Sequence, residues 1–206
     1  MNRPETIQVT GENLHRVAEQ AASLLQGGAL VVIPTDTVYG LAAAYNQPQA
    51  EQRMFGVKGR DPAKPVPLLA SDLRYVQELA RHLSQAESRL ASAFWPGPLT
   101  LVVQTASGAE GCRIPDHGVA IEVIRAAGGL LRVTSANRSG EPPALTAEEA
   151  LRALGSAADL YLDAGPSAGG VPSTVVCIES QRLRVLRAGA LTEEALRREL
   201  GDLIHA

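Results

Sequence analysis

The chain has 206 residues, which is enough to bury a core but short for two full domains, so we expect one domain. Hydrophobic residues make up 45% and charged residues 20%, which is typical of a globular protein and excludes a disordered one. The net charge of −3 and the aromatic content of 3% exclude a general nucleic-acid coat but leave room for a local basic cleft.

Two further classes of protein are disfavoured by what the sequence lacks. Neither the cysteines nor the histidines have the spacing of metal ligands, so no metal site is expected. The N-terminus has no basic region followed by an apolar run, and no apolar run approaches the roughly 18 residues of a membrane span. We therefore expect a cytoplasmic protein without a membrane partner.

The first half of the chain alternates between helical and extended patterns. Leu14, Val17, Ala21 and Leu25 recur at helical spacing, and Gly27–Gly28 ends that helix. Helices are predicted at 13–26, 49–55, 72 to about 82, and 85–94, and strands at 29–33, 66–70 and 99–104.

The second half adds strands at the end. In chain order we predict a strand at 112–114, helices at 119–127 and 146–154, strands at 131–134, 160–162, 174–178 and 183–186, and a helix capped by Thr192. Thr146 and Glu149 form a capping box at the start of one helix. This order predicts a single α/β domain with a twisted, mixed (parallel and antiparallel) open sheet flanked by helices.

Both lysines of the chain lie in one short loop, at Lys58 and Lys64, with Arg60 between them. The other 17 basic residues are arginines, which suggests that lysine is kept where a compact ammonium is needed. Three cations this close repel one another unless an anion lies between them. The loop therefore predicts a phosphate or carboxylate site; the alternative is a solvated loop with two lysines by chance.

Two polar turns follow predicted strands. The turn 35–40 holds Thr35, an aspartate and a tyrosine, and could bind a small polar ligand or could equally cap a helix. Ser135 and Asn137 begin the second turn, whose small residues would let the backbone approach phosphate; a plain polar loop is the alternative. Open sheets of this class bind ligands at the carboxyl ends of strands.

Three more polar residues lie at strand boundaries. Ser173 opens a strand, and Arg113 and Arg187 each adjoin one, where an arginine is more often a surface ion pair. The hydroxyl turns, the two arginines and the lysine loop all lie at predicted strand boundaries. No nucleophile–base pair or pair of carboxylates accompanies them in the sequence. Such a set favours chemistry by positioning and charge, as in phosphoryl or nucleotidyl transfer.

Several longer motifs resemble one known family. They read PTDTVYGLA at 34–42, KGR at 58–60, WPGPLTLV at 95–102, RIPDH at 113–117, TSANRSGEPP at 134–143, STVV at 173–176 and LRAG at 186–189. In these stretches the chain resembles the YrdC-like family, the threonylcarbamoyl-AMP synthases of tRNA modification. It looks like the short form of that family, one YrdC-like domain over 1–206 without a further C-terminal domain.

The resemblance implies an activity and partners. The family makes threonylcarbamoyl-AMP and pyrophosphate from L-threonine, bicarbonate and ATP, with Mg²⁺ accompanying ATP. The adenylate then serves threonylcarbamoyl-transferase proteins that modify adenosine 37 of tRNAs reading ANN codons. Carried over by motif, threonine would be held by Thr35, Arg113 and Ser173. ATP would be held by Lys58, Arg60, Lys64, Ser135, Asn137, Pro143 and Arg187, with Lys58 and Arg60 also catalytic.

The sequence departs from the family pattern in three places. Asp61 separates Arg60 from the proline that usually follows it, and Pro172 and Cys177 stand where carboxylates are usual. Gly111–Cys112 replaces a pair of small apolar residues before Arg113. These changes leave the expected ligand contacts intact but raise the prospect of a divergent paralogue.

Two other functions are compatible with the same resemblance. Members of the family have been regarded as double-stranded RNA binders or ribosome-assembly factors, although the acidic charge and the few aromatic residues favour a small-molecule site. Any binding of tRNA or double-stranded RNA is expected to be weak. A carbamoyl-transfer module, as in hydrogenase-maturation enzymes, would come in a longer chain with zinc-finger-like cysteines.

Overall fold

A computed structural model describes residues 4–59 and 65–205 of the chain. The strands are β1 Glu5–Gln8, β2 Val31–Ile33, β3 Gly40–Ala44, β4 Leu68–Ala70, β5 Leu99–Thr105, β6 Gly108–Arg113, β7 Leu130–Ser135, β8 Leu160–Asp163, β9 Thr174–Glu179 and β10 Arg182–Arg187. The helices are α1 Leu14–Gln26, α2 Pro48–Lys58, α3 Leu73–Leu79, α4 Gln85–Phe94, α5 Gly118–Ala126, α6 Ala147–Leu154 and α7 Glu193–Leu200, with short 3₁₀ turns at Gly155–Ala157 and Gly201–Leu203.

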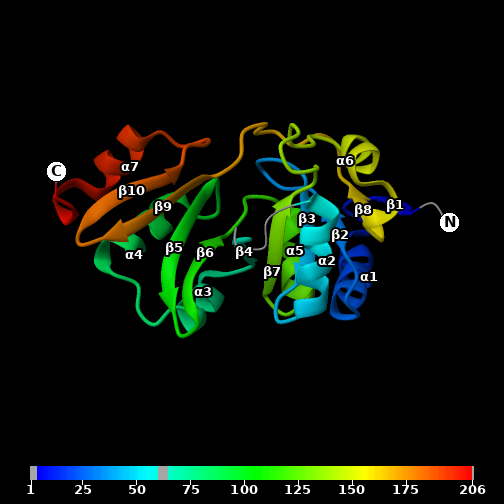
Figure 1. Ribbon diagram of the computed structural model, residues 1–206, viewed down its shortest axis with the longest axis horizontal. Coiled ribbons are helices and arrows are strands. Elements are labelled where there is room, and N and C mark those ends of the chain that lie inside the picture. Colours follow the sequence, from blue (N-terminus) through cyan, green and yellow to red (C-terminus); the bar gives the residue numbers. More distant parts are fainter. Residues whose placement is uncertain (1–3, 60–64, 206) are drawn as a thin grey trace.

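The described strands form one mixed sheet in the order β1-β8-β2-β3-β7-β4-β6-β5-β9-β10. The pairs β1–β8, β2–β8, β4–β6 and β5–β9 are parallel, and the remaining pairs are antiparallel. The sheet consists of two halves (Figure 1). One half contains β5, β6, β9 and β10, and the other contains β1, β2, β3, β7 and β8. Short β4 lies between them and joins β7 to β6. The predicted fold class is confirmed.

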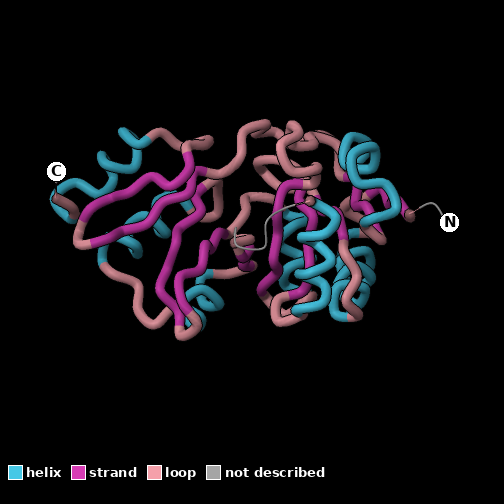
Figure 2. Tube along the Cα trace, viewed as in Figure 1, coloured by secondary structure: helices cyan, strands magenta, loops and turns pink. Residues whose placement is uncertain are grey.

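Three apolar clusters fill the space between the sheet and the helices. In β2, Val31 and Ile33 point into the cluster beneath α1 and α5, whereas Val32 points into the cluster beneath α2 and α6. The third cluster packs α3, α4 and α7 against the half that contains β5 and β9. Figure 2 shows the two halves joined along the top by loops, one of which is the 164–173 connection from β8 to β9.

Several boundaries differ from the sequence prediction. β1 and β3 were not predicted, because β1 is largely exposed and β3 is built from glycine, alanine and one leucine. β6 begins at Gly108 rather than at 112, because it forms a hairpin with β5 whose turn is capped by the Thr105 hydroxyl. Thr146 caps α6 as predicted, but Glu149 accepts from the amide of Leu145 instead of closing the box on Thr146.

In the part of the chain that the structure describes, no helix has the length and apolar character needed to cross a membrane.

Candidate active site

The turn 34–39 connects β2 to antiparallel β3, so the helix-cap interpretation of its polar residues is wrong. The Thr35 hydroxyl donates to the carbonyl of Val38 at 2.6 Å and accepts from the amide of Thr37 at 3.2 Å. Only 3% of Thr35 and 2% of Thr37 are exposed. Hydrogen bonds within the turn therefore fix the positions of its threonine hydroxyls.

Arg113, at the end of β6, binds this turn from the other half of the sheet. Its Nη1 donates to the Thr37 hydroxyl at 2.9 Å, its Nε donates to the carbonyl of Gly97 at 3.0 Å, and its Nη2 pairs with the Asp36 carboxylate. The interpretation of Arg113 as a surface pair is wrong, because 5% of the residue is exposed. Burial lowers the pKa of Arg113, Asp36 raises it, and the nearby positive charge of Arg187 lowers it further.

Ser173 and Arg187 lie together at the start of β9 and the end of β10. Arg187 Nη2 donates to the Ser173 carbonyl at 2.7 Å and to the Ser173 hydroxyl at 3.0 Å. The same hydroxyl lies 2.7 Å from the hydroxyl of Thr100 on β5. Two predicted ligand groups, one for threonine and one for ATP, therefore contact each other directly.

Lys58 ends α2 and is bound to the polar residues that follow β7. Its ammonium donates to the Ser135 carbonyl at 2.6 Å, to Asn137 Oδ1 at 2.8 Å and to the Ser135 hydroxyl at 3.2 Å. These three contacts fix the position of the ammonium beside the turn that follows β7. Only 4% of Lys58 is exposed. That a compact ammonium is needed at this position stays a prediction.

The turn 34–39 adjoins the other predicted groups through the backbone. Ala136 donates to the carbonyl of Tyr39 at 2.8 Å, which places the turn beside Ser135 and Asn137. Pro143 is half-buried, and its neighbour Ala144 accepts from the amide of Tyr39 at 2.9 Å. The residues Thr35, Lys58, Arg113, Ser135, Asn137, Pro143, Ser173 and Arg187 thus belong to one connected region, whereas Arg60 and Lys64 lie outside the described residues.

The 164–173 connection between β8 and β9 also packs against the turn 34–39. Gly170 donates to the carbonyl of Thr37 at 2.9 Å, and a Cβ on Gly169 would lie 2.5 Å from the carbonyl oxygen of Asp36. Gly169 is therefore required by close packing. Because the sheet is mixed, Ser173 precedes its strand while Arg113 and Arg187 end theirs, which agrees with the predicted positions of these residues at strand boundaries.

Four residues of the region were absent from the sequence-predicted site. Asp36, Thr37, Gly97 and Thr100 all contact predicted ligand groups. Asp36 and Thr37 lie in the PTDT motif and could have been included from that signal. Gly97 and Thr100 lie in the WPGPLTLV motif, but the motif alone does not show which partners they contact, because those contacts depend on strand register and on the path of the backbone.

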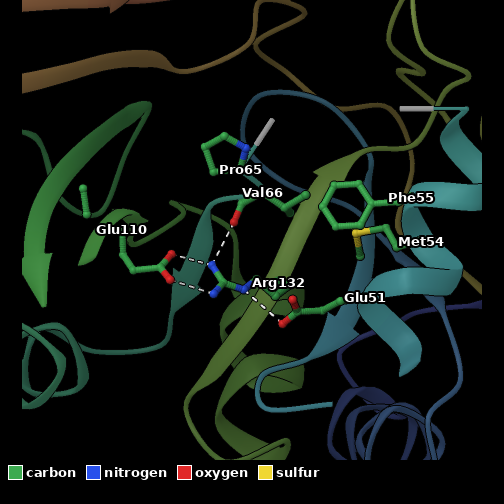
Figure 3. A pocket seen from close by; sticks show the side chains of 8 residues that line it. Glu51, Met54, Phe55, Pro65, Val66, Glu110 and Arg132 are labelled. Carbon is green, nitrogen blue, oxygen red and sulfur yellow. Dashed lines mark hydrogen bonds and ion pairs between the residues drawn. The ribbon is translucent and has the colours of Figure 1, made fainter. Parts of the chain in front are cut away.

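A cavity of about 210 Å³ lies apart from these groups, between α2, β6 and β7 (Figure 3). Arg132 fills one wall, with both oxygens of Glu110 at 2.6 and 2.8 Å and Glu51 at 3.1 Å. Burial opposes the charge of Arg132, but the two carboxylates more than compensate, so its pKa is raised. None of the predicted ligand residues within 4–59 and 65–205 lines the cavity, and its arginine is already paired with two carboxylates, so we place the candidate ligand site in the connected region instead.

Comparisons with known proteins identify the family. Residues 23–189 match the model of the Sua5_yciO_yrdC family, described as telomere recombination. A Mycobacterium tuberculosis protein provisionally named threonylcarbamoyl-AMP synthase is 38% identical and covers 92% of both chains. The threonylcarbamoyl-AMP synthase of Chromohalobacter salexigens is 33% identical over 82% of this chain and 96% of its own.

The solved structures agree. The crystal structure of P. abyssi Sua5 complexed with L-threonine superposes with a TM-score of 0.89 at 28% identity and covers 96% of this chain. This chain spans 60% of the length of that Sua5 chain. The family match over most of the sequence, together with these relatives, shows that the chain belongs to the Sua5–YciO–YrdC family.

Proposed function

We propose that the protein is a threonylcarbamoyl-AMP synthase, which makes threonylcarbamoyl-AMP and pyrophosphate from L-threonine, bicarbonate and ATP. The observation that carries the proposal is the similarity to the threonine-bound Sua5 structure and to relatives named for this activity. The connected region supports it, because buried cations and hydroxyls gather there from both halves of the sheet.

Threonine would occupy the part of the region around Arg113. Three of the five guanidinium protons are used on Gly97, Thr37 and Asp36, which leaves two to meet a carboxylate. Asp36 provides the opposite charge beside them, so the pair matches a zwitterionic amino acid. Thr35 and Ser173 would add hydroxyl contacts.

ATP would lie toward Lys58 and Arg187, with Ser135, Asn137 and Pro143 beside it. Arg113 and Arg187 disfavour each other's charge, so a phosphate between them would relieve that repulsion. Arg60 and Lys64 complete this set by motif. Among the described residues no group of three or more His, Cys, Asp or Glu could hold an ion, so we propose that Mg²⁺ enters with ATP as part of the substrate.

In the proposed reaction, the protein acts by positioning the substrates and by meeting their charges. The threonine amine combines with bicarbonate to give the carbamate and water, and a carbamate oxygen then attacks the α-phosphorus of ATP. The bond from that phosphorus to the bridging oxygen breaks, and pyrophosphate leaves with its charge met by Lys58. A single lost charge contact in such a site costs about 2.7–4 kcal/mol of transition-state stabilisation.

The product would be consumed by a threonylcarbamoyl-transferase acting on tRNA in the cytoplasm. The names of the relatives favour the synthase over the RNA-binding alternative, because the activity they record is small-molecule synthesis.

Pyrophosphate release tests the proposal. We expect release from ATP only when L-threonine and bicarbonate are both present. Equal ATP turnover without threonine would contradict the assignment.

A further inference from the structure

Thr100 lies between Arg113 and Arg187 in the order of the strands, within the WPGPLTLV motif, but it was not among the predicted ligand residues. β5 pairs Leu101 with Cys112, so Thr100 comes opposite Arg113 one step further along β6. On the other side, β5 is parallel to β9, whose first residue follows Ser173. Thr100 is 2% exposed, and its hydroxyl lies 2.7 Å from the Ser173 hydroxyl.

Whether the Ser173 hydroxyl can donate a hydrogen bond to a ligand depends on its contact with Thr100. A hydroxyl has one proton to donate and two lone pairs, whereas a guanidinium only donates. Arg187 Nη2 lies 3.0 Å from the Ser173 hydroxyl and therefore fills one of its lone pairs. The contact with Thr100 then uses either the second lone pair or the single proton of Ser173.

Each arrangement leaves one hydroxyl proton without an acceptor among the described residues, but only in one of them does that proton belong to Ser173, the predicted ligand residue. If Ser173 donated to Thr100, the Thr100 proton would need another acceptor, and the described residues show no other contact of its hydroxyl. An unsatisfied buried donor is costly. If Thr100 donates to Ser173, both lone pairs of Ser173 are filled, and its proton is left for an acceptor on a ligand.

We propose that Thr100 is a positioning residue that donates its proton to Ser173 and thereby fixes the Ser173 hydroxyl as a hydrogen-bond donor to the carboxylate of the amino-acid substrate. This inference rests on the proposed function. Thr100 acts through Ser173, so its effect is on threonine binding rather than on the reacting atoms.

Thr100→Val tests the role, because valine keeps the shape and removes the hydroxyl. We expect the KM for threonine to rise about fivefold or more, the effect of losing one buried hydrogen bond, while the KM for ATP changes less than twofold. Thr100→Ser should restore the wild-type value. Thr100→Cys, which keeps the volume and has a weak donor, should lie between them and replaces the valine variant if that one does not fold.

Thr105→Val is the matched control. Thr105 lies on the same strand, is 4% exposed, and donates its hydroxyl to the Gly108 carbonyl at 2.8 Å, away from the site. A general loss of stability would therefore appear in both variants, but only Thr100→Val should change the threonine KM. Equal threonine KM values in the two variants would overturn the inference.

A double-mutant cycle separates positioning from structural support. If Thr100 acts through Ser173, adding Thr100→Val to Ser173→Ala should raise the threonine KM no further. Independent, multiplying effects would overturn the inference while leaving the synthase assignment in place. If the wild-type protein neither binds L-threonine in calorimetry nor needs it for pyrophosphate release, the proposed function itself fails and the role of Thr100 fails with it.

Discussion

Lys58 and Arg113 carry two buried positive charges, with 4% and 5% of each residue exposed. Removing a cation from water is costly, so such residues persist where hydrogen bonds hold them. Both are held by oxygens of the site itself, Lys58 by Ser135 and Asn137 and Arg113 by the turn 34–39. At the scale of single residues, we therefore propose that the site is preorganised for an anion.

Lys58→Arg should lower kcat/KM for ATP by about tenfold or more, because a planar fork cannot reproduce three contacts converging on one ammonium. Steady-state pyrophosphate release at matched folded fraction measures the effect. The control is Arg89→Lys, the reverse exchange in a surface ion pair with Glu199. Rates within about twofold of wild type for Lys58→Arg would show that the retained lysine has no special role.

Ser173→Ala should raise the KM for threonine by about 10- to 150-fold, the effect of a hydrogen bond to a charged ligand, and should change the KM for ATP less. The two KM values are measured with the other substrates saturating. Ser107→Ala, in the β5–β6 turn, serves as the control. An unchanged threonine KM would remove Ser173 from the amino-acid pocket.

At the scale of elements, hydrophobic pattern predicted most helices and strands because each buries one face against a recognisable cluster. β3 escaped prediction since Gly40–Ala44 has no β-branched residue and owes its position to its neighbours β2 and β7. In the site, motifs predicted residues that the structure brings together in the connected region, and their ligand roles stay predictions. The Asp36–Arg113 pair and the Thr100–Ser173 contact depend on strand order and register, which local sequence does not encode.

Asp159 joins three elements at one end of the sheet. Its carboxylate accepts from the Leu30 amide at 2.8 Å and from Arg53 of α2 at 2.8 and 2.9 Å. Burial raises the pKa of Asp159, but the Arg53 and Leu30 hydrogen bonds and the Arg53 charge outweigh it, so the folded-state pKa is lowered. Ionised Asp159 therefore stabilises the fold above its unfolded pKa, and this contribution is lost as the pH falls through the folded pKa.

Asp159→Asn should accordingly lower the free energy of unfolding at neutral pH, and the difference from wild type should shrink in acid, at a pH below the lowered folded-state pKa of Asp159. Urea unfolding at both pH values measures it. A difference that stays constant with pH would show that the hydrogen-bond geometry matters and the charge does not.

Glu110→Gln should destabilise the fold because it leaves Arg132, a largely buried cation, with half its charge partners. Breaking a buried pair costs about 3–5 kcal/mol, and the remaining Glu51 contact places the expected loss near the lower end. Chemical denaturation measures the change. Glu193→Gln, which breaks an exposed pair with Arg197, should cost less than about 1 kcal/mol, and equal losses in the two variants would refute the account of Arg132.

At the scale of the whole molecule, the candidate site draws residues from both halves of the sheet, because the turn 34–39 follows β2 and Arg113 ends β6, two strands that Figure 1 shows in different halves. The turn 34–39, which leads into β3, binds Arg113 at the end of β6. In the sheet, β7 and β4 lie between β3 and β6. We therefore expect the contacts between Arg113 and this turn to bring together substrate groups bound on the two halves.

RNA binding should be weak, because the net charge is −3 and the basic groups of the site are assigned to ATP. An unmodified ANN-reading tRNA titrated at several salt concentrations should lose affinity steeply with salt and be displaced by ATP with Mg²⁺. Tight, salt-resistant binding that ATP leaves unchanged would reveal a separate RNA surface and favour RNA binding as the main function.

The most direct test of the central claim is the identity of the product. The protein is incubated with ATP, Mg²⁺, L-threonine and isotopically labelled bicarbonate, and the nucleotide products are analysed by mass spectrometry. The account predicts an adenylate that contains threonine and carries the label of bicarbonate, formed together with pyrophosphate and absent when threonine is omitted. An adenylate without the label, or hydrolysis of ATP with no threonine-containing product, would contradict it.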